Sequence, residues 1–95
     1  MTDSIILYAS DYCSHSWAVK SFLAEYDVPV TIVNIDDDPQ AREQLKAINR
    51  GYASVPTLVF PDGRQLTEPS IRQVRAELNL ESPGLIDRAL GFLGI

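Results

Sequence analysis

The chain has 95 residues, a formal net charge of −5 at pH 7 and 45% hydrophobic residues, which predicts one globular domain spanning residues 1–95. With only eight Lys and Arg residues, so acidic a domain is poorly suited to bind nucleic acid or an anionic membrane surface. No apolar run approaches the roughly 20 residues that span a bilayer, and the first residues carry no signal-peptide pattern. A single cysteine provides no disulfide framework, so we expect a cytoplasmic protein.

Strand and helix patterns alternate in the first half of the chain. Residues 4–9 are apolar and predict a buried strand, whereas apolar residues at helical spacing predict a helix over 13–26. The β-branched segment 29–35 predicts a second strand. Three consecutive aspartates followed by Pro39 are typical of a helix start, and this helix is expected to run to about Ile48.

The second half begins with a predicted strand over residues 54–60, which starts around a proline. The Pro-Asp-Gly-Arg sequence at 61–64 predicts a hairpin turn into a short strand at 65–67. Ser70 and Gln73 have the spacing of a capping box, which predicts the start of another helix.

That helix is expected to end near Leu80, and Ser82-Pro83 predicts the start of a last helical segment. The resulting order is β-α-β-α-β-β-α plus a C-terminal helix. Strands joined by helices imply a parallel portion of the sheet with right-handed crossovers, and the closing hairpin adds an antiparallel edge. The predicted fold class is therefore α/β, a three-layer sandwich around a mixed four-stranded sheet.

Cys13 is the only cysteine, and it lies where the first strand turns into the first helix. The N-terminus of a helix carries unpaired N–H groups and partial positive charge, and both favour the thiolate form of a cysteine. Many free cysteines are instead buried and inert. The polar neighbours of Cys13 favour a reactive thiol.

Two short motifs carry a resemblance to a known family. The turn at residues 12–20 holds a Cys-x-x-Ser sequence with a lysine seven residues after the cysteine, and a Val-Pro-Thr sequence stands at 55–57. Their order and positions resemble the glutaredoxin branch of the thioredoxin fold. The stretch 55–70, with its Val-Pro-Thr, Asp-Gly turn and Leu-Thr-x-Pro-Ser, is similar to the mycoredoxin subgroup.

The chain departs from the usual family pattern at three places. Ser16 stands where most members have a second cysteine. Ser10 and Asp11 occupy the stretch that often carries a lysine for a glutathione carboxylate. The stretch 68–70, Glu-Pro-Ser, replaces a Gly-rich, Asp-containing segment, which again is similar to the mycoredoxin pattern.

The resemblance implies a thiol–disulfide oxidoreductase that acts in redox homeostasis and electron transfer. Its co-substrate would be a low-molecular-weight thiol, glutathione or mycothiol, and its substrates would be mixed disulfides between that thiol and proteins. Cys13 would be the nucleophile of a monothiol mechanism. The active-site turn would comprise Tyr12, Ser14, His15 and Ser16, and the bound thiol would contact Val55, Pro56, Thr67, Glu68 and Ser70.

Several site residues have more than one interpretation. Ser16 is either natural or an engineered replacement for a resolving cysteine, and the natural interpretation is favoured. His15 could lower the pKa of Cys13 as an imidazolium, but a solvated turn residue is the preferred interpretation. Asp11 and the acidic chain would oppose the thiolate. The resemblance implies that Pro56 follows a cis peptide bond.

Two other functions remain open at this stage. A dimer could share a [2Fe–2S] cluster through two Cys13 thiolates and two external thiols. The domain could instead be a non-enzymatic protein-interaction module, in which Cys13 would be dispensable. We expect no tightly bound cofactor, no metal site of the chain's own and a monomer. The apolar segment 83–95 could pack on the domain, dimerise or contact a partner.

Overall fold

The computed structural model describes residues 4–80 of the chain, which form four strands and three helices. In chain order these are β1 (Ile5–Ala9), α1 (Ser14–Glu25), β2 (Val30–Asn34), α2 (Pro39–Ile48), β3 (Thr57–Val59), β4 (Gln65–Thr67) and α3 (Ile71–Glu77). The predicted order of elements is confirmed up to α3. The predicted helical segment after Pro83 lies outside the described residues.

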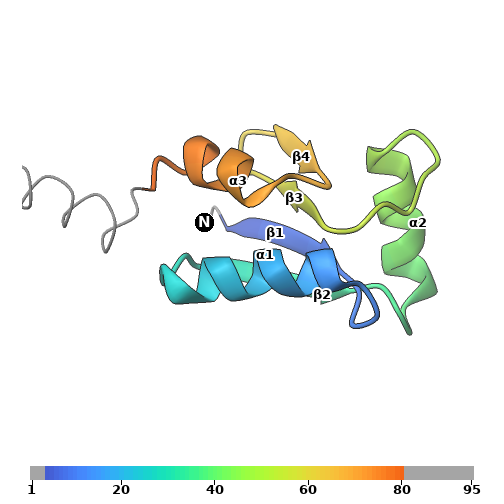
Figure 1. Cartoon of the computed structure of the whole chain (residues 1–95). Helices are drawn as coiled ribbons and strands as arrows, with labels where there is room; N and C mark the ends of the chain where they lie inside the picture. Colours follow the sequence, from blue (N-terminus) through green and yellow to red (C-terminus); the bar gives the residue numbers. More distant parts are fainter. Residues whose placement is uncertain (1–3, 81–95) are drawn as a thin grey trace, which may run out of the picture.

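The four strands form one mixed sheet in the order β2-β1-β3-β4 (Figure 1). Strand β1 runs parallel to β2 and antiparallel to β3, and β3 pairs with β4 as an antiparallel hairpin. The predicted α/β fold with a mixed four-stranded sheet is therefore confirmed. The parallel strands β1 and β2 have their carboxyl ends at the same end of the sheet, and the turn that holds Cys13 follows β1 directly.

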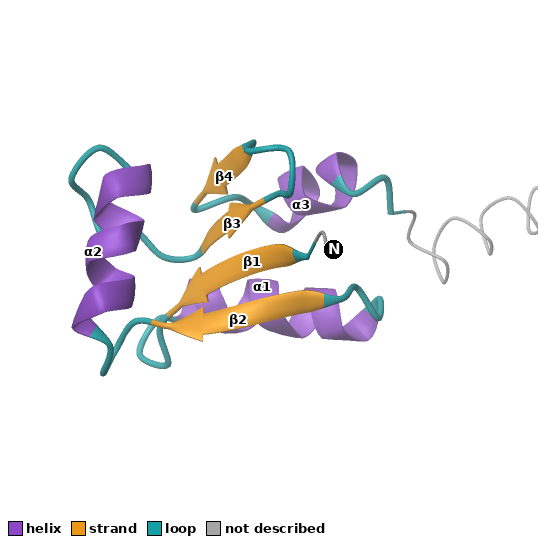
Figure 2. Ribbon diagram, turned by 180° about the vertical axis from the view of Figure 1, so that it is seen from behind, coloured by secondary structure: helices purple, strands orange, loops and turns teal. Residues whose placement is uncertain are grey.

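Side chains alternate between two cores, one on each face of the sheet. Leu7 and Leu58 belong to a core with Leu23 of α1 and Val74 of α3, because successive residues of a strand point to opposite faces. Tyr8 contributes to the second core together with α2 residues. Figures 1 and 2 show α1 and α3 on the same side of the sheet and α2 near the ends of β1 and β2.

Two predicted boundaries were wrong. Strand β3 covers Thr57–Val59 and not 54–60, since Pro56 has no N–H to donate to a neighbouring strand. Helix α3 ends at Glu77 and not near Leu80. Asn79 has a φ of 57° there, and the N–H of Leu80 donates back to the carbonyl of Arg75, which closes the helix.

The predicted helix starts agree with the observed caps. Asp38 accepts a hydrogen bond from the N–H of Ala41 at the start of α2. Ser70 and Gln73 form the predicted capping box of α3. Within residues 4–80, no helix is long and apolar enough to cross a membrane.

Candidate active site

Cys13 is the N-cap residue of α1, directly after the turn that follows β1. Its backbone is extended, with φ −117° and ψ 115°, and its carbonyl accepts the N–H of Trp17 at 3.1 Å. In this conformation the side chain occupies the position of a capping group. The Sγ atom accepts a hydrogen bond from the N–H of Ser16 at 3.4 Å, so the thiol contacts the end of the helix that favours a negative charge.

The net effect of these surroundings is a lowered pKa of the Cys13 thiol. Partial burial is the largest single influence and raises the pKa, but it is outweighed by hydrogen bonds from the Ser16 N–H, the Ser16 hydroxyl and the His15 N–H. The negative charge of Glu68 also raises the pKa. Asp11 was expected to oppose the thiolate, but its carboxylate pairs with Lys20 at 3.8 Å and Glu68 is the acidic group that acts on Cys13.

Ser16 is fully buried one turn into α1. Its hydroxyl accepts the N–H of Ser10 at 3.3 Å, and the N–H of Cys13 donates to the carbonyl of Ser10 at 3.3 Å. A serine side chain therefore fills the interior position beneath the turn. It holds the turn in place and supplies no second thiol.

Asp36, which the sequence patterns did not indicate, fixes the same turn from outside. Its carboxylate accepts the Ser10 hydroxyl at 2.6 Å and the Asp11 N–H at 2.8 Å. These hydrogen bonds, first that from the Ser10 hydroxyl, lower the pKa of the Asp36 carboxyl. Asp36 follows β2, which lies beside β1 in the sheet, so only the tertiary structure brings it to the Cys13 turn.

The turn after β1 and the first turn of α1 form one wall of the site, and the segment before β3 forms the second wall. The Val55–Pro56 peptide bond is cis, as the resemblance implied. The carbonyl of Val55 lies 3.8 Å from Cys13 Sγ. The carbonyl of Pro56 accepts the N–H of Glu68 at 2.7 Å, so the β4–α3 loop is attached to this segment and brings Glu68 within electrostatic reach of the thiol.

His15 connects the two walls, and the interpretation of it as a solvated turn residue was wrong. Its side chain is half-buried, and Nε2 lies 2.6 Å from the carbonyl of the buried Pro69. The imidazole thus holds the β4–α3 loop against the first turn of α1. Its backbone N–H, and not an imidazolium charge, is the part of His15 that lowers the pKa of Cys13.

The other predicted site residues lie around these walls with different roles. Tyr12 is 90% exposed beside Cys13, and Ser14 is also exposed as the first residue of α1. The hydroxyl of Ser70 accepts the N–H of Gln73 in the helix cap. The hydroxyl of Thr67 donates to the side-chain carbonyl of Asn49 at 2.8 Å. The roles of Ser70 and Thr67 in binding a thiol therefore stay predictions.

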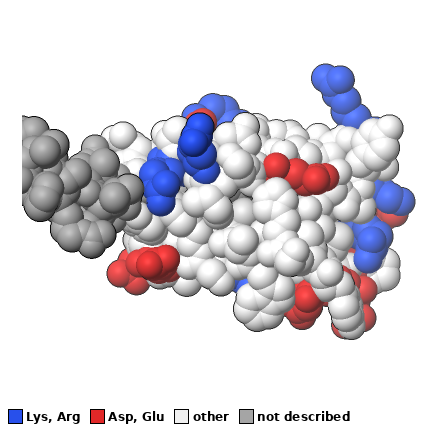
Figure 3. All heavy atoms as spheres, in the orientation of Figure 1, with Lys and Arg blue, Asp and Glu red and all other residues white. Residues whose placement is uncertain are grey.

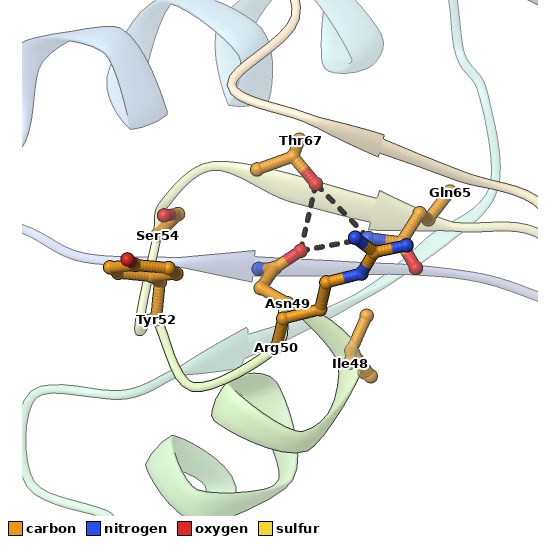
Figure 4. A pocket seen from close by; sticks show the side chains of 7 residues that line it. All are labelled: Ile48, Asn49, Arg50, Tyr52, Ser54, Gln65 and Thr67. Atoms are coloured by element: carbon orange, nitrogen blue, oxygen red, sulfur yellow. Dashed lines mark hydrogen bonds between the residues drawn. The ribbon is translucent and has the colours of Figure 1, made fainter.

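Beyond Thr67 a hollow opens between the end of α2 and strand β4 (Figure 4). Its volume is about 450 Å³, and its lining consists of Ile48, Asn49, Arg50, Tyr52, Ser54, Gln65 and Thr67. The Gln65 amide nitrogen donates to the Asn49 side chain at 2.7 Å and to the Thr67 hydroxyl at 3.1 Å. No sequence pattern indicated this hollow, because its residues come from two separate segments, 48–54 and 65–67.

Charge is unevenly distributed around the site. Asp11, Asp37 and Asp38 are exposed on the loops that follow β1 and β2, and Figure 3 shows acidic side chains at that end of the molecule.

Lys20, the lysine of the family motif, lies 4.5 Å from the ring centroid of Trp17 as well as near Asp11. Trp17 is 52% exposed and donates its indole N–H to the Asp11 carbonyl at 3.2 Å.

The arrangement of a helix-capping cysteine beside a cis-proline segment defines a thioredoxin-like protein, and solved structures agree. A variant of the thioredoxin-like protein BC3987 superposes with a TM-score of 0.73 at 31% identity, over 82% of this chain and 97% of that chain. The glutaredoxin from Methanosarcina mazei Go1 superposes with a TM-score of 0.66 at 21% identity, over 79% of this chain and 77% of that one.

Sequence comparison gives the family. The Glutaredoxin profile matches residues 5–65. Mycoredoxin 1 of Corynebacterium glutamicum is 31% identical over 79% of this chain and 92% of its own length. The Mycobacterium tuberculosis protein Rv3198A, named as a glutaredoxin, is 31% identical over 82% of this chain and 93% of its own length. The chain belongs to the glutaredoxin family, whose members are in general thiol–disulfide oxidoreductases that use low-molecular-weight thiols.

Proposed function

We propose that the protein reduces mixed disulfides between proteins and a low-molecular-weight thiol by a monothiol mechanism. The Cys13 thiolate attacks the sulfur of the small thiol, a new disulfide forms between Cys13 and that thiol, and the protein sulfur leaves as a thiolate that takes up a proton. A second small-thiol thiolate then attacks the adduct, which releases the oxidised small thiol and regenerates the Cys13 thiolate. The protein disulfide gains two electrons, and the two small thiols supply them.

The observation that carries this proposal is the position of Cys13 Sγ. It accepts the Ser16 N–H at the start of α1 and lies 3.8 Å from the Val55 carbonyl. The lowered pKa increases the thiolate fraction near neutral pH. The backbone beside Val55 offers peptide groups to the bound thiol, and the buried Ser16 can stabilise the thiolate but cannot resolve an adduct.

The identity of the small thiol is the second part of the proposal. The resemblance of residues 55–70 to mycoredoxins, together with the 31% identity to mycoredoxin 1, supports mycothiol over glutathione. Glu68 also supports this choice, because its negative charge beside Cys13 disfavours a thiol that places a carboxylate there.

The test is the intact mass of the reduced protein after incubation with mycothiol disulfide or, separately, glutathione disulfide. We expect one adduct per chain, at Cys13, which free thiol removes, and a faster reaction with mycothiol disulfide. Cys13→Ser should give no adduct. Faster reaction with glutathione disulfide would contradict the choice of thiol, and no adduct with either disulfide would contradict the transferase function.

A further inference from the structure

The hollow between α2 and β4 has features of a binding site that the thiol chemistry itself does not require. Its wall begins at Ser54, next to the Val55 that contacts Cys13, and continues through Tyr52 to Arg50 at the end of α2. In Figure 4 the Arg50 side chain crosses the hollow with its guanidinium near Gln65, while Tyr52 and Ser54 stand at the other end. The hollow therefore adjoins the thiol site on the side facing α2.

The polar groups of the hollow favour an anionic ligand. Asn49 and Thr67 hydrogen-bond to each other, and both accept from the Gln65 amide nitrogen, so this part of the lining is internally satisfied. The remaining donors are the guanidinium of Arg50 and the hydroxyls of Tyr52 and Ser54. None of the residues in 4–80 that line the hollow is acidic, and a guanidinium binds a carboxylate with two parallel hydrogen bonds.

The backbone of Arg50 supplies an independent reason to assign a role to its side chain. Each of the three helices in residues 4–80 is followed, two positions after its last residue, by a residue of positive φ, and the next N–H donates back into the last turn: Asp27 has φ 53°, Arg50 has φ 58° and Asn79 has φ 57°. Asp and Asn are enriched in this conformation, and Gly is its usual occupant at a helix end. Arginine is not among the residues enriched in this conformation, so its backbone directs attention to its side chain.

We propose that this hollow binds an acidic side chain of the protein substrate, in the stretch that flanks the cysteine carrying the small thiol. This inference rests on the proposed transferase function and adds a preference among its protein substrates. Glu68 disfavours an anion next to Cys13, so we assign the carboxylate to the protein substrate and place it in the hollow beside Arg50, Tyr52 and Ser54. The small thiol keeps the space between Cys13, Val55 and Glu68.

The test uses two peptides that carry the same small thiol in a mixed disulfide. One peptide has glutamates at the three positions on each side of its cysteine, and the other has glutamines. We expect the unaltered protein to reduce the glutamate peptide with a kcat/KM about two- to fivefold higher, the range of one solvent-exposed ion pair. This preference should shrink as salt is added, because salt screens exposed charges.

Arg50→Asn separates substrate binding from folding. Asparagine adopts the positive φ more readily than arginine, so the variant should have an equal or higher midpoint of thermal unfolding while losing the preference for the glutamate peptide. Arg50→Glu should invert the preference. Lys46→Gln is the matched control: like Arg50→Asn, it removes one positive charge, but Lys46 lies within α2, pairs with Glu43 and does not line the hollow, so the preference should persist.

Each other outcome has a defined meaning. Equal rates with the two peptides in the unaltered protein would overturn the hollow as a subsite while leaving the transferase function intact. A preference that survives Arg50→Asn, or that Lys46→Gln also removes, would overturn the role of Arg50. A fall in the reaction of Arg50→Asn with the free small-thiol disulfide would assign the hollow to the small thiol. No reduction of either peptide would contradict the proposed function itself.

Discussion

The pKa of Cys13 depends on opposing groups from the first turn of α1 and from the β4–α3 loop. Burial, the largest single influence, and Glu68 raise the pKa of Cys13, whereas hydrogen bonds from Ser16 and His15 lower it. The lowering effects together are larger, so the net pKa is lowered. Because the folded-state pKa is lowered, the thiolate adds to stability above the pKa of the unfolded thiol, and this contribution is lost as pH falls through the folded-state pKa. The same balance sets the rate at which the thiol reacts.

We expect the alkylation rate of Cys13 by iodoacetamide to rise with pH through a midpoint below that of an unperturbed thiol, about 8.5. Glu68→Gln should move the midpoint lower, since it removes a nearby negative charge. Ser16→Ala should move it higher, because the Ser16 hydroxyl no longer donates to the thiolate. A Glu68→Gln midpoint equal to or above that of the unaltered protein would contradict this description of the site.

Asp36 acts on the same turn through Ser10 and Asp11. Its folded-state pKa is lowered, so the stability it contributes is present above the unfolded pKa of about 3.9 and is lost as pH falls through the lowered folded-state pKa. We therefore expect Asp36→Asn to be less stable than the unaltered protein at pH 7 in urea unfolding. The difference should disappear in acid, where both proteins carry a neutral side chain at this position. A difference independent of pH would exclude the ionised carboxylate as the cause.

Helix α3 depends on its cap more than the longer helices do. It spans only Ile71–Glu77, and so short a helix gains little from its own hydrogen bonds. Ser70 accepts the N–H of Gln73, and the Gln73 side chain accepts the N–H of Ser70. This pair fixes where the β4–α3 loop ends, and that loop carries the Pro69 carbonyl contacted by His15.

Ser70→Ala should lower the free energy of unfolding by about 1 kcal/mol, which corresponds to about 4–8 °C in the midpoint of thermal unfolding for a domain of this size. Ser21→Ala is the matched control, because Ser21 is exposed within α1 and caps nothing. Circular dichroism on heating measures both. An equal effect of the two substitutions would show that the cap adds nothing specific.

For the molecule as a whole, two hydrophobic cores fix the positions of the two walls of the site relative to each other. One core joins α1 and α3 to the sheet, and the other joins α2 to Tyr8 and Ile35 and packs against Val55. The second core is small, with four buried members in residues 4–80. A cavity there has consequences for both the fold and the site.

We expect Leu45→Ala, at a fully buried position in the second core, to cost about 2–5 kcal/mol in urea unfolding. This is a large part of a typical total stability of about 5–15 kcal/mol. Ile32→Ala removes a side chain that is 45% exposed and should cost less than about 1 kcal/mol. Similar costs for the two variants would show that α2 does not pack on the sheet as described.

The sequence by itself determined the order of elements up to α3, the start of α2 after the three aspartates, the helix cap at Ser70, and the position of Cys13 between a strand and a helix. These features depend on local periodicity and on residues close in the chain. The tertiary structure alone decided that Asp36 reaches Ser10, that His15 reaches Pro69, and that Arg50 shares a hollow with Gln65. Such contacts join segments whose separation along the chain is bridged only when strands pair and helices pack, and no pattern within one segment records them.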